Sequence, residues 1–228
     1  ILLADGVHYR FNGHDFVHYL LVIKQISQNK GYFLDPLLLK GRESYGRWNR
    51  VLRSISPEIR HRIVALVSDD FRGSERVVSE REWVWQRCHF HLLYQLYRRL
   101  GRRKSWSPTR RLKEEAYLLV KTILREGDEQ ILKEEIDQLK FIRKDKLLSA
   151  KFRSILNGFL SSTEQFRSYL KYPELHLPVT NNSLESTAGI IRRQTGKLNT
   201  PQSLEVWTKG LLRMRQSVVC NGSNYQPN

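Results

Sequence analysis

The sequence predicts an α/β protein in which a mixed β-sheet is flanked by helices and interrupted by an all-helical insertion. Three observations support this fold class. Residues 1–37 are rich in strand-like runs, and residues 63–67 form the short, β-branched, uniformly apolar run that is typical of a buried parallel strand. From about residue 91 to residue 175, apolar positions recur with helical spacing instead. The length of 228 residues is ample for a substantial core.

The predicted sheet begins at the N-terminus. Residues 1–11 form an apolar strand that contains Asp5-Gly6, and Asn12-Gly13 then has the composition of a hairpin turn. Further strands are expected at residues 16–26 and 31–34. Residues 43–55 have helical spacing, residues 63–67 form the buried strand, and a helix-like stretch leads to a strand at residues 83–85. The order β-β-β-α-β-α-β favours a mixed sheet with helices on its faces.

The middle of the chain is predicted to be helical. Helices are expected at residues 92–100, 112–125, 130–142 and 162–172, and two amphipathic helices, at 183–193 and 203–216, follow Pro173 and Pro178. We therefore divide the chain into the first part of a sheet domain (1–91), an all-helical insertion (92–178) and C-terminal helices that return to the sheet (179–228). The polar residues 221–228 are expected to be frayed.

Charge indicates the partner. Lys and Arg number 39 against 23 Asp and Glu, which gives a net charge of +16 and a pI of about 10.1. Such a surplus favours binding of a polyanion, with nucleic acid as the first choice and an anionic membrane surface as the alternative. No apolar run approaches the roughly 18 residues of a spanning helix, so we expect no membrane partner.

The termini and the cysteines suggest where the protein acts. No signal peptide is visible, and the chain starts without Met on a strand-like run, so we expect a fragment that lacks its N-terminal part. Two cysteines, Cys88 and Cys220, provide no disulfide framework. This composition favours a reducing compartment, either the cytoplasm of a bacterium, close to the nucleoid, or the nucleus of a eukaryote.

Asp5 is the first candidate functional residue. Asp-Gly is common in turns and bulges, which gives Asp5 a purely structural explanation. The strand pattern continues on both sides of it, however. A carboxylate in the middle of a strand is costly to desolvate, which favours a metal ion or another cation as its partner.

Asp69 is the second candidate, because it follows the buried strand and ligand sites gather at the carboxyl ends of such strands. An alternative is that Ser68, Asp69 or Asp70 caps the helix that follows. Since neighbouring strand residues point to opposite faces, Asp69 and Asp70 cannot both join one site. We assign Asp69 to the site and Asp70 to the helix cap.

Glu185 is the third candidate. If Asn182 is the N-cap of the late helix, Glu185 occupies the third helical position and completes a capping box. That role is compatible with metal binding, because a carboxylate there points toward the start of the helix. Arg192 lies seven residues further on the same face, where it could contact a phosphate beside the metal.

Four phrases in order resemble a known family: Asp5-Gly6; Val67-Ser68-Asp69 with Gly73; Gln86-Arg87-Cys88-His89-Phe90-His91; and Thr180-Asn181-Asn182-Ser183-Leu184-Glu185. Together they resemble the DDE transposases of the Mutator-like group and related bacterial insertion sequences. The aspartates are 64 residues apart, and Glu185 follows Asp69 by 116 residues, a gap that an insertion domain would fill. The family commonly has Gly where this chain has Asp70.

The resemblance implies an RNase H-like catalytic domain in which Asp5, Asp69 and Glu185 hold two Mg²⁺ (or Mn²⁺) ions. It implies DNA transposition: nicking at transposon ends and strand transfer by 3′-hydroxyl attack on target DNA, by a chain that forms a homo-oligomer on DNA. Two hard cations suit this chemistry. Two alternatives stay open, a catalytically silent nucleic-acid-binding protein derived from a transposase and an RNase H-like nuclease without strand transfer.

Two further groups of residues are candidates. Cys88-x-x-His91 supplies two of the four ligands that zinc needs, so we expect Cys88 and His91, like Asn182, to support the site instead. Residues 98–111 contain seven basic residues and no acidic one. This run is either a solvated face or a DNA-contact loop. In the second case the contacts would come from Arg102, Arg103, Lys104, Trp106, Arg110 and Arg111.

Overall fold

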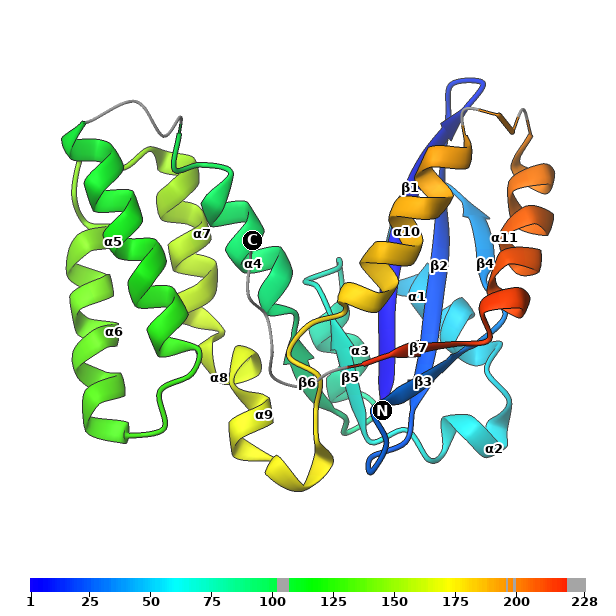
Figure 1. Cartoon of the computed structure of the whole chain (residues 1–228), viewed down its shortest axis with the longest axis horizontal. Helices are drawn as coiled ribbons and strands as arrows, with labels where there is room; N and C mark the ends of the chain where they lie inside the picture. The colour runs from blue at the N-terminus through cyan, green and yellow to red at the C-terminus, as the bar shows by residue number, and fades with distance from the viewer. Residues whose placement is uncertain (102–106, 196, 199, 221–228) are drawn as a thin grey trace. The chain divides into compact units, whose positions relative to one another are not determined.

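The computed structural model describes residues 1–101, 107–195, 197, 198 and 200–220 (Figure 1). The chain divides into two compact units. The first unit comprises Ile1–Arg87 and Tyr172–Asn228, and the second comprises Cys88–Lys171. For comparison, the sequence led us to expect the helical insertion at residues 92–178.

The first unit is built on a mixed sheet of seven strands, in the order β6-β5-β1-β2-β3-β7 with β4 also paired to β2. The strands are β1 (Leu2–Phe11), β2 (His14–Lys24), β3 (Lys30–Phe33), β4 (Leu37–Lys40), β5 (Ala65–Ser68), β6 (Val84–Arg87) and β7 (Ser217–Val219). β1, β5 and β6 run parallel to one another, whereas β2 is antiparallel to its three neighbours β1, β3 and β4. β1 therefore joins the parallel and antiparallel halves.

The β1–β2 hairpin has the predicted turn. Asn12 and Gly13 both have positive φ, 46° and 78°, as the tight turns that match the twist of a hairpin require. β1 and β2 then pair without interruption from Phe11↔His14 to Leu2↔Ile23.

One face of the sheet packs on α1 (Tyr45–Arg53) and α3 (Ser74–Ser79), and the short helix α2 (Pro57–Arg60) follows α1. Alternate residues of the strands, among them Leu2 and Ala4, join this core. On the helical side Trp48 is fully buried and stacks on Phe71, with ring centroids 4.2 Å apart. The helical stripe predicted at residues 43–55 therefore faces this core, as its spacing indicated.

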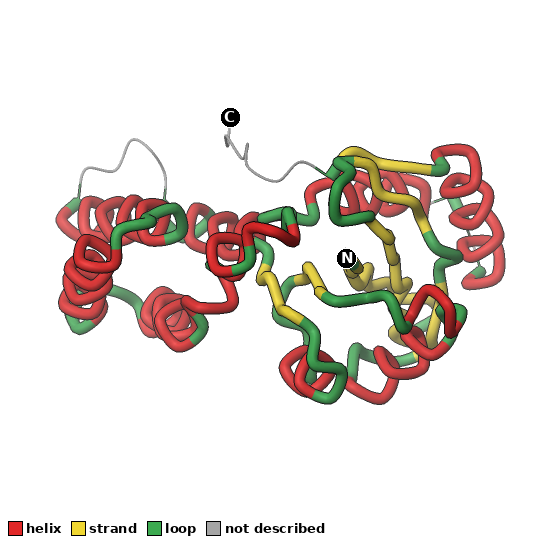
Figure 2. The backbone as a smooth tube through the Cα atoms, turned by 90° about the horizontal axis from the view of Figure 1, so that it is seen from below, coloured by secondary structure: helices red, strands yellow, loops and turns green. Residues whose placement is uncertain are grey.

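The other face is covered by α10 (Asn182–Thr195) and α11 (Pro201–Arg215) (Figure 2). Leu184, Ala188 and Ile191 recur along α10 at helical spacing and are fully buried. β1 alternates its side chains between the two cores, so Leu3, Asp5 and Val7 belong to the face opposite Leu2 and Ala4. A 3-10 turn, η1 (Pro173–Leu175), precedes α10.

The second unit is helical throughout the part that the structure describes. Its helices are α4 (His89–Tyr97), α5 (Pro108–Ile123), α6 (Glu129–Arg143), α7 (Ala150–Ser161), α8 (Thr163–Phe166) and α9 (Ser168–Lys171). Its core is formed by one stripe from each long helix, including Val120, Leu139, Phe152 and Phe159.

This architecture confirms the predicted fold class, a mixed α/β sheet flanked by helices as in RNase H-like proteins. The sequence pattern did not predict β4, β7, α2 or α7. The helix expected at residues 162–172 is broken, because Arg167 leaves the helical region at φ −107° and ψ 10°. The predicted frayed segment 221–228 lies outside the described residues.

Candidate metal centre

Asp5 lies in the middle of β1 and is 3% exposed. The strand has no bulge here, since Asp5 pairs with Leu20 and Gly6 with Tyr19 of β2. The explanation of Asp5-Gly6 as a turn is therefore wrong. Burying a carboxylate costs free energy unless charge or hydrogen bonds compensate it, so a mid-strand aspartate at this depth is typical of a functional position.

Glu185 lies in the first turn of α10, the helix that packs on β1. A carboxylate oxygen of Glu185 and one of Asp5 lie within 4.8 Å of each other. The helix starts differently from the prediction. The Glu185 amide donates to the Asn181 carbonyl at 3.1 Å, which places Asn181 rather than Asn182 at the N-cap. The capping box predicted between Asn182 and Glu185 requires Asn182 at the N-cap, so it does not form. Asn181 is buried and Asn182 is exposed.

Arg192 stands on the same face of α10 as Glu185. Its Nη1 lies 3.9 Å from Glu185 Oε2, with the Arg192 side chain 50% exposed and the Glu185 side chain 18% exposed. This spacing matches the seven-residue separation noted in the sequence. The guanidinium lies beside Glu185 and still faces solvent.

Asp69 follows β5, the parallel neighbour of β1. Leu3 of β1 pairs with Val67 of β5. Asp5 is two residues after Leu3, and Asp69 is two residues after Val67. Asp69, directly after the end of β5, is therefore level with Asp5 in the middle of β1 when this register is continued. Asp69 is half-buried. Among the described residues, its carboxylate does not lie within 4.8 Å of both Asp5 and Glu185.

Asp70 has structural partners. Its Oδ2 accepts from Arg87 Nη2 at 2.8 Å, and its Oδ1 accepts from Ser74 Oγ at 3.2 Å. The N-cap of α3 is Gly73, which has φ 92°, so the assignment of Asp70 to the helix cap is wrong. Glycine fits there because a side chain is strained at this φ. With both carboxylate oxygens engaged, Asp70 is less suited than Asp69 to a metal.

Glu43 is an acidic residue that the sequence did not single out. Its side chain is 17% exposed, and its Oε2 lies 3.4 Å from His8 Nε2. A Cβ placed on Gly6 would lie 2.2 Å from Glu43 Oε1, so the carboxylate occupies the space that Gly6 leaves open. Burial raises the pKa of Glu43, and the negative charge of Asp69 raises it further.

Two features of the sequence are consistent with a role for Glu43 outside the helix. The pattern placed Glu43 at the start of the helix 43–55, whereas α1 begins at Tyr45 with Ser44 as its N-cap. Glu43 therefore precedes the helix and does not cap it. Gly6, next to Asp5, was the complementary signal, because glycine in a strand often marks close approach of another group.

The chemistry of the donors suits a hard divalent cation. Asp5 and Glu185 present carboxylate oxygens within 4.8 Å, and Asp69 follows the adjacent strand. Carboxylates this close repel each other when both are ionised, and a cation between them offsets the repulsion. Carboxylate oxygens are the ligands that Mg²⁺ and Mn²⁺ prefer in proteins. These residues therefore fit a magnesium or manganese site.

The other predicted residues have the following positions. Cys88, which is 1% exposed, is the N-cap residue of α4, and His91 lies on α4 itself. Arg110 pairs with Glu114 within α5, at 2.6 Å between Nη2 and Oε1, and Arg111 is exposed on the same helix. The remaining predicted DNA-contact residues, Arg102, Arg103, Lys104 and Trp106, lie outside the described residues.

Comparison with protein families gives a match. A protein-family model described as "Transposase, Mutator family" matches residues 36–202, which is more than half of the chain. The matched range contains Asp69 and Glu185, and Asp5 precedes it. A search of curated proteins found no match. In the part of the chain that the structure describes, none of the helices has the length and apolar character that crossing a membrane requires.

Proposed function

The chain belongs to the Mutator family of transposases, and from this premise we propose that its first unit is a metal-dependent catalytic domain. It nicks DNA at transposon ends and joins the freed 3′-hydroxyl to target DNA. In this proposal the helical unit Cys88–Lys171 is the insertion that separates Asp69 from Glu185 in the sequence.

The convergence of Asp5 and Glu185 carries the proposal. The two residues are 180 positions apart in the chain, yet their carboxylate oxygens lie within 4.8 Å. Asp69 stands next to Asp5 at the carboxyl end of the adjacent strand. Carboxylates that come this close from separate elements repel one another when ionised, which supports a role in binding cations.

We assign roles to the residues as follows. Asp5, Asp69 and Glu185 hold two Mg²⁺ or Mn²⁺ ions. When bound, these ions supply an activated water or 3′-hydroxyl and stabilise the leaving oxygen of the phosphodiester. β1 fixes Asp5 in a buried position, and α10 carries Glu185 to it. Arg192, half-exposed beside Glu185, contacts a phosphate of the DNA.

The test is an assay of nicking and joining on a duplex that carries the terminal sequence of the element encoding this chain. We expect Asp5→Asn, Asp69→Asn and Glu185→Gln each to abolish both reactions in Mg²⁺. Losing the outer partners of metal ligands already costs about 10–100-fold, so loss of a ligand should exceed that range. Full joining activity in any of the three variants would remove that residue from the site.

The matched control is Asp70→Asn, which removes a neighbouring carboxylate that is already bonded to Arg87 and Ser74. We expect this variant to retain nicking and joining in Mg²⁺. If Asp70→Asn is inactive while Asp69→Asn is active, the ligand is Asp70. Cleavage without joining would identify a nuclease, and DNA binding without either reaction would identify a silent derivative.

A further inference from the structure

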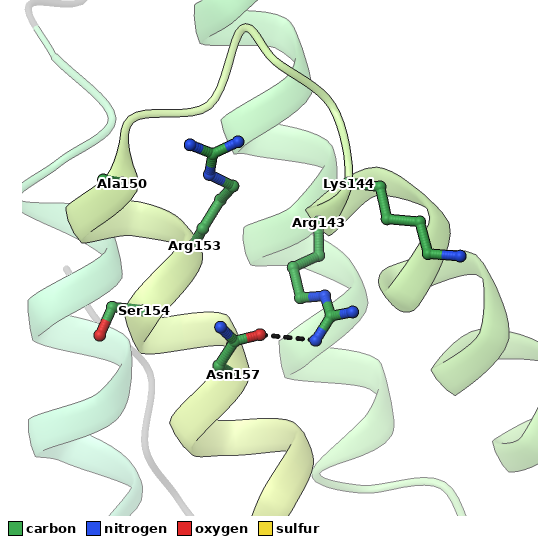
Figure 3. Close-up of a pocket in the computed structure, with 6 residues that line it drawn as sticks. All are labelled: Arg143, Lys144, Ala150, Arg153, Ser154 and Asn157. Atoms are coloured by element: carbon green, nitrogen blue, oxygen red, sulfur yellow. Dashed lines mark hydrogen bonds between the residues drawn. The ribbon is translucent and has the colours of Figure 1, made fainter.

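A basic pocket lies in the second unit, between the end of α6 and the start of α7. It encloses about 440 Å³. Figure 3 shows Arg143 and Lys144 where α6 ends, and Arg153 and Asn157 on α7. Its lining is Arg143, Lys144, Ala150, Arg153, Ser154 and Asn157.

The charge of the pocket is unbalanced. Three of its six lining residues are cationic and none is acidic. Among the described residues, no carboxylate lies within salt-bridge distance of Arg143, Lys144 or Arg153. Lys140, one turn before Lys144 on α6, is by contrast paired with Asp137 at 2.8 Å. The pocket therefore carries a local excess of positive charge.

Helix stability explains only part of this charge. Arg143 and Lys144 stand at the C-terminal end of α6, where cations favourably interact with the helix dipole. Arg153 is different, because the first turn of α7 is the positive end of that helix and a cation there is unfavourable. The first turn of α7 has no acidic residue to offset it. The helix dipole therefore does not account for the position of Arg153.

The pocket is also ordered by its own contacts. Arg143 Nη1 donates to Asn157 Oδ1 at 2.6 Å, which fixes the guanidinium between the two helices. Asp145, the one acidic residue between Arg143 and Arg153, accepts from the Leu147 amide at 2.8 Å and so orders the connection. An ordered guanidinium presents several donors in a planar fork, as phosphate recognition requires.

We propose that this pocket binds a backbone phosphate of DNA. The proposal rests on the proposed function for its ligand, since a transposase acts on DNA. Arg143 and Arg153 donate to the phosphate oxygens, and Lys144 adds charge at the rim. These contacts address the sugar–phosphate backbone, so they position the DNA without reading its sequence.

The test measures binding of the full chain to a labelled DNA duplex by fluorescence anisotropy, in EDTA and at several salt concentrations. The variant is Lys144→Gln/Arg153→Gln, which spares the Arg143–Asn157 bond. We expect an affinity loss of about tenfold at low salt. We also expect the slope of log K against log salt to become shallower by about 1–2, as for one or two lost phosphate contacts.

The control is Lys133→Gln/Lys140→Gln, which removes the same charge from α6 outside the pocket. Thermal unfolding checks that both variants fold. Equal losses in the two variants would mean that bulk charge alone matters, and unchanged binding in the pocket variant would likewise overturn the proposal. If the pocket variant keeps its DNA affinity but loses stabilisation by inorganic phosphate, the pocket takes a free anion instead.

This measurement is independent of catalysis. Without a divalent cation no strand is cut, so the anisotropy reports DNA binding separately from catalysis. Failure of the Asp5 and Glu185 variants to lose activity would refute the catalytic proposal and leave the phosphate site standing. Unchanged DNA binding in the pocket variant would refute the phosphate site and leave the catalytic proposal standing.

Discussion

At the scale of single residues, Gly6 and Glu43 form a close contact next to Asp5. The Glu43 carboxylate fills the position of the missing Gly6 side chain, with Val17 Cγ1 as the next neighbour at 3.3 Å from a Cβ there. This contact links the residue after Asp5 to a carboxylate that lies close enough to Asp69 to respond to its charge. Glu43 therefore lies against the face of β1 opposite Asp5.

We expect Gly6→Ala to lower the free energy of unfolding by about 1 kcal/mol, because the new methyl group must displace the Glu43 carboxylate. Chemical denaturation measures this loss. Gly158→Ala is the matched control, since a Cβ there meets nothing within 4 Å in the interior of α7. That change should stabilise by about 0.5–1 kcal/mol. In Glu43→Ala, the further change Gly6→Ala should cost less stability than it does in the unchanged chain. If the losses of the two single variants simply add in the double variant, Gly6 and Glu43 do not compete for the same space.

His18 gives the first unit a dependence on pH. It is fully buried in β2, and burial lowers its pKa to about 4 from 6.5, with a smaller contribution from Lys209. The unfolded chain takes up a proton below pH 6.5 while the folded chain does not. Stability from His18 is therefore complete above pH 6.5 and is lost as the pH falls toward 4, by up to about 3 kcal/mol.

The check compares the pH dependence of unfolding in His18→Leu with that in His61→Leu, where the replaced histidine is exposed. The His18 variant should lose less stability between pH 6.5 and pH 4 than the unchanged chain. The His61 variant should follow the unchanged chain. Parallel curves for all three proteins would show that His18 is not responsible.

At the scale of elements, α10 holds Glu185 through its buried stripe. Leu184 is fully buried next to Glu185, and Ala188 and Ile191 continue the stripe against the sheet. Leu184→Ala should cost about 2–4 kcal/mol of stability, because it leaves a cavity beneath the first turn of the helix. Thermal and chemical unfolding test this. Ser186→Ala, at an exposed position of the same turn, should be nearly neutral; a similar loss in both would argue against the stripe.

The helices and strands also differ in whether the sequence pattern predicted them. The long strands and most of the long helices were predictable, because alternation and helical spacing extend over many residues in them. β4 and β7 were not, since four- and three-residue strands depend on their partners β2 and β3 for definition. α7 lacked a prediction although Phe152, Leu156 and Phe159 mark its buried face.

Some residues of the candidate site were likewise predictable from the sequence, and others were not. Asp5 and Asp69 were identifiable because each is tied to a strand, and Glu185 because it opens a helix. Glu43 was not, since its position depends on the tertiary contact with Gly6. The cap at Gly73 and the bonds of Asp70 were equally invisible, because they depend on Arg87 and Ser74 coming together.

At the scale of the whole molecule, the net charge of +16 should dominate DNA binding. A protein that makes about 6–10 phosphate contacts loses about 10³–10⁵ in affinity between 50 mM and 200 mM salt. We expect this chain to fall in that range when its affinity for duplex DNA is titrated against salt. An affinity that hardly changes would mean that the surplus charge does not contact the phosphate backbone.

The most direct test of the central claim is a titration of Mn²⁺ into the full chain, followed by electron paramagnetic resonance. If Asp5 and Glu185 hold the cation, Asp5→Asn and Glu185→Gln should each weaken Mn²⁺ binding by more than about tenfold. Asp70→Asn should leave it unchanged. Mn²⁺ binding of unchanged strength in both Asp5→Asn and Glu185→Gln would contradict the account.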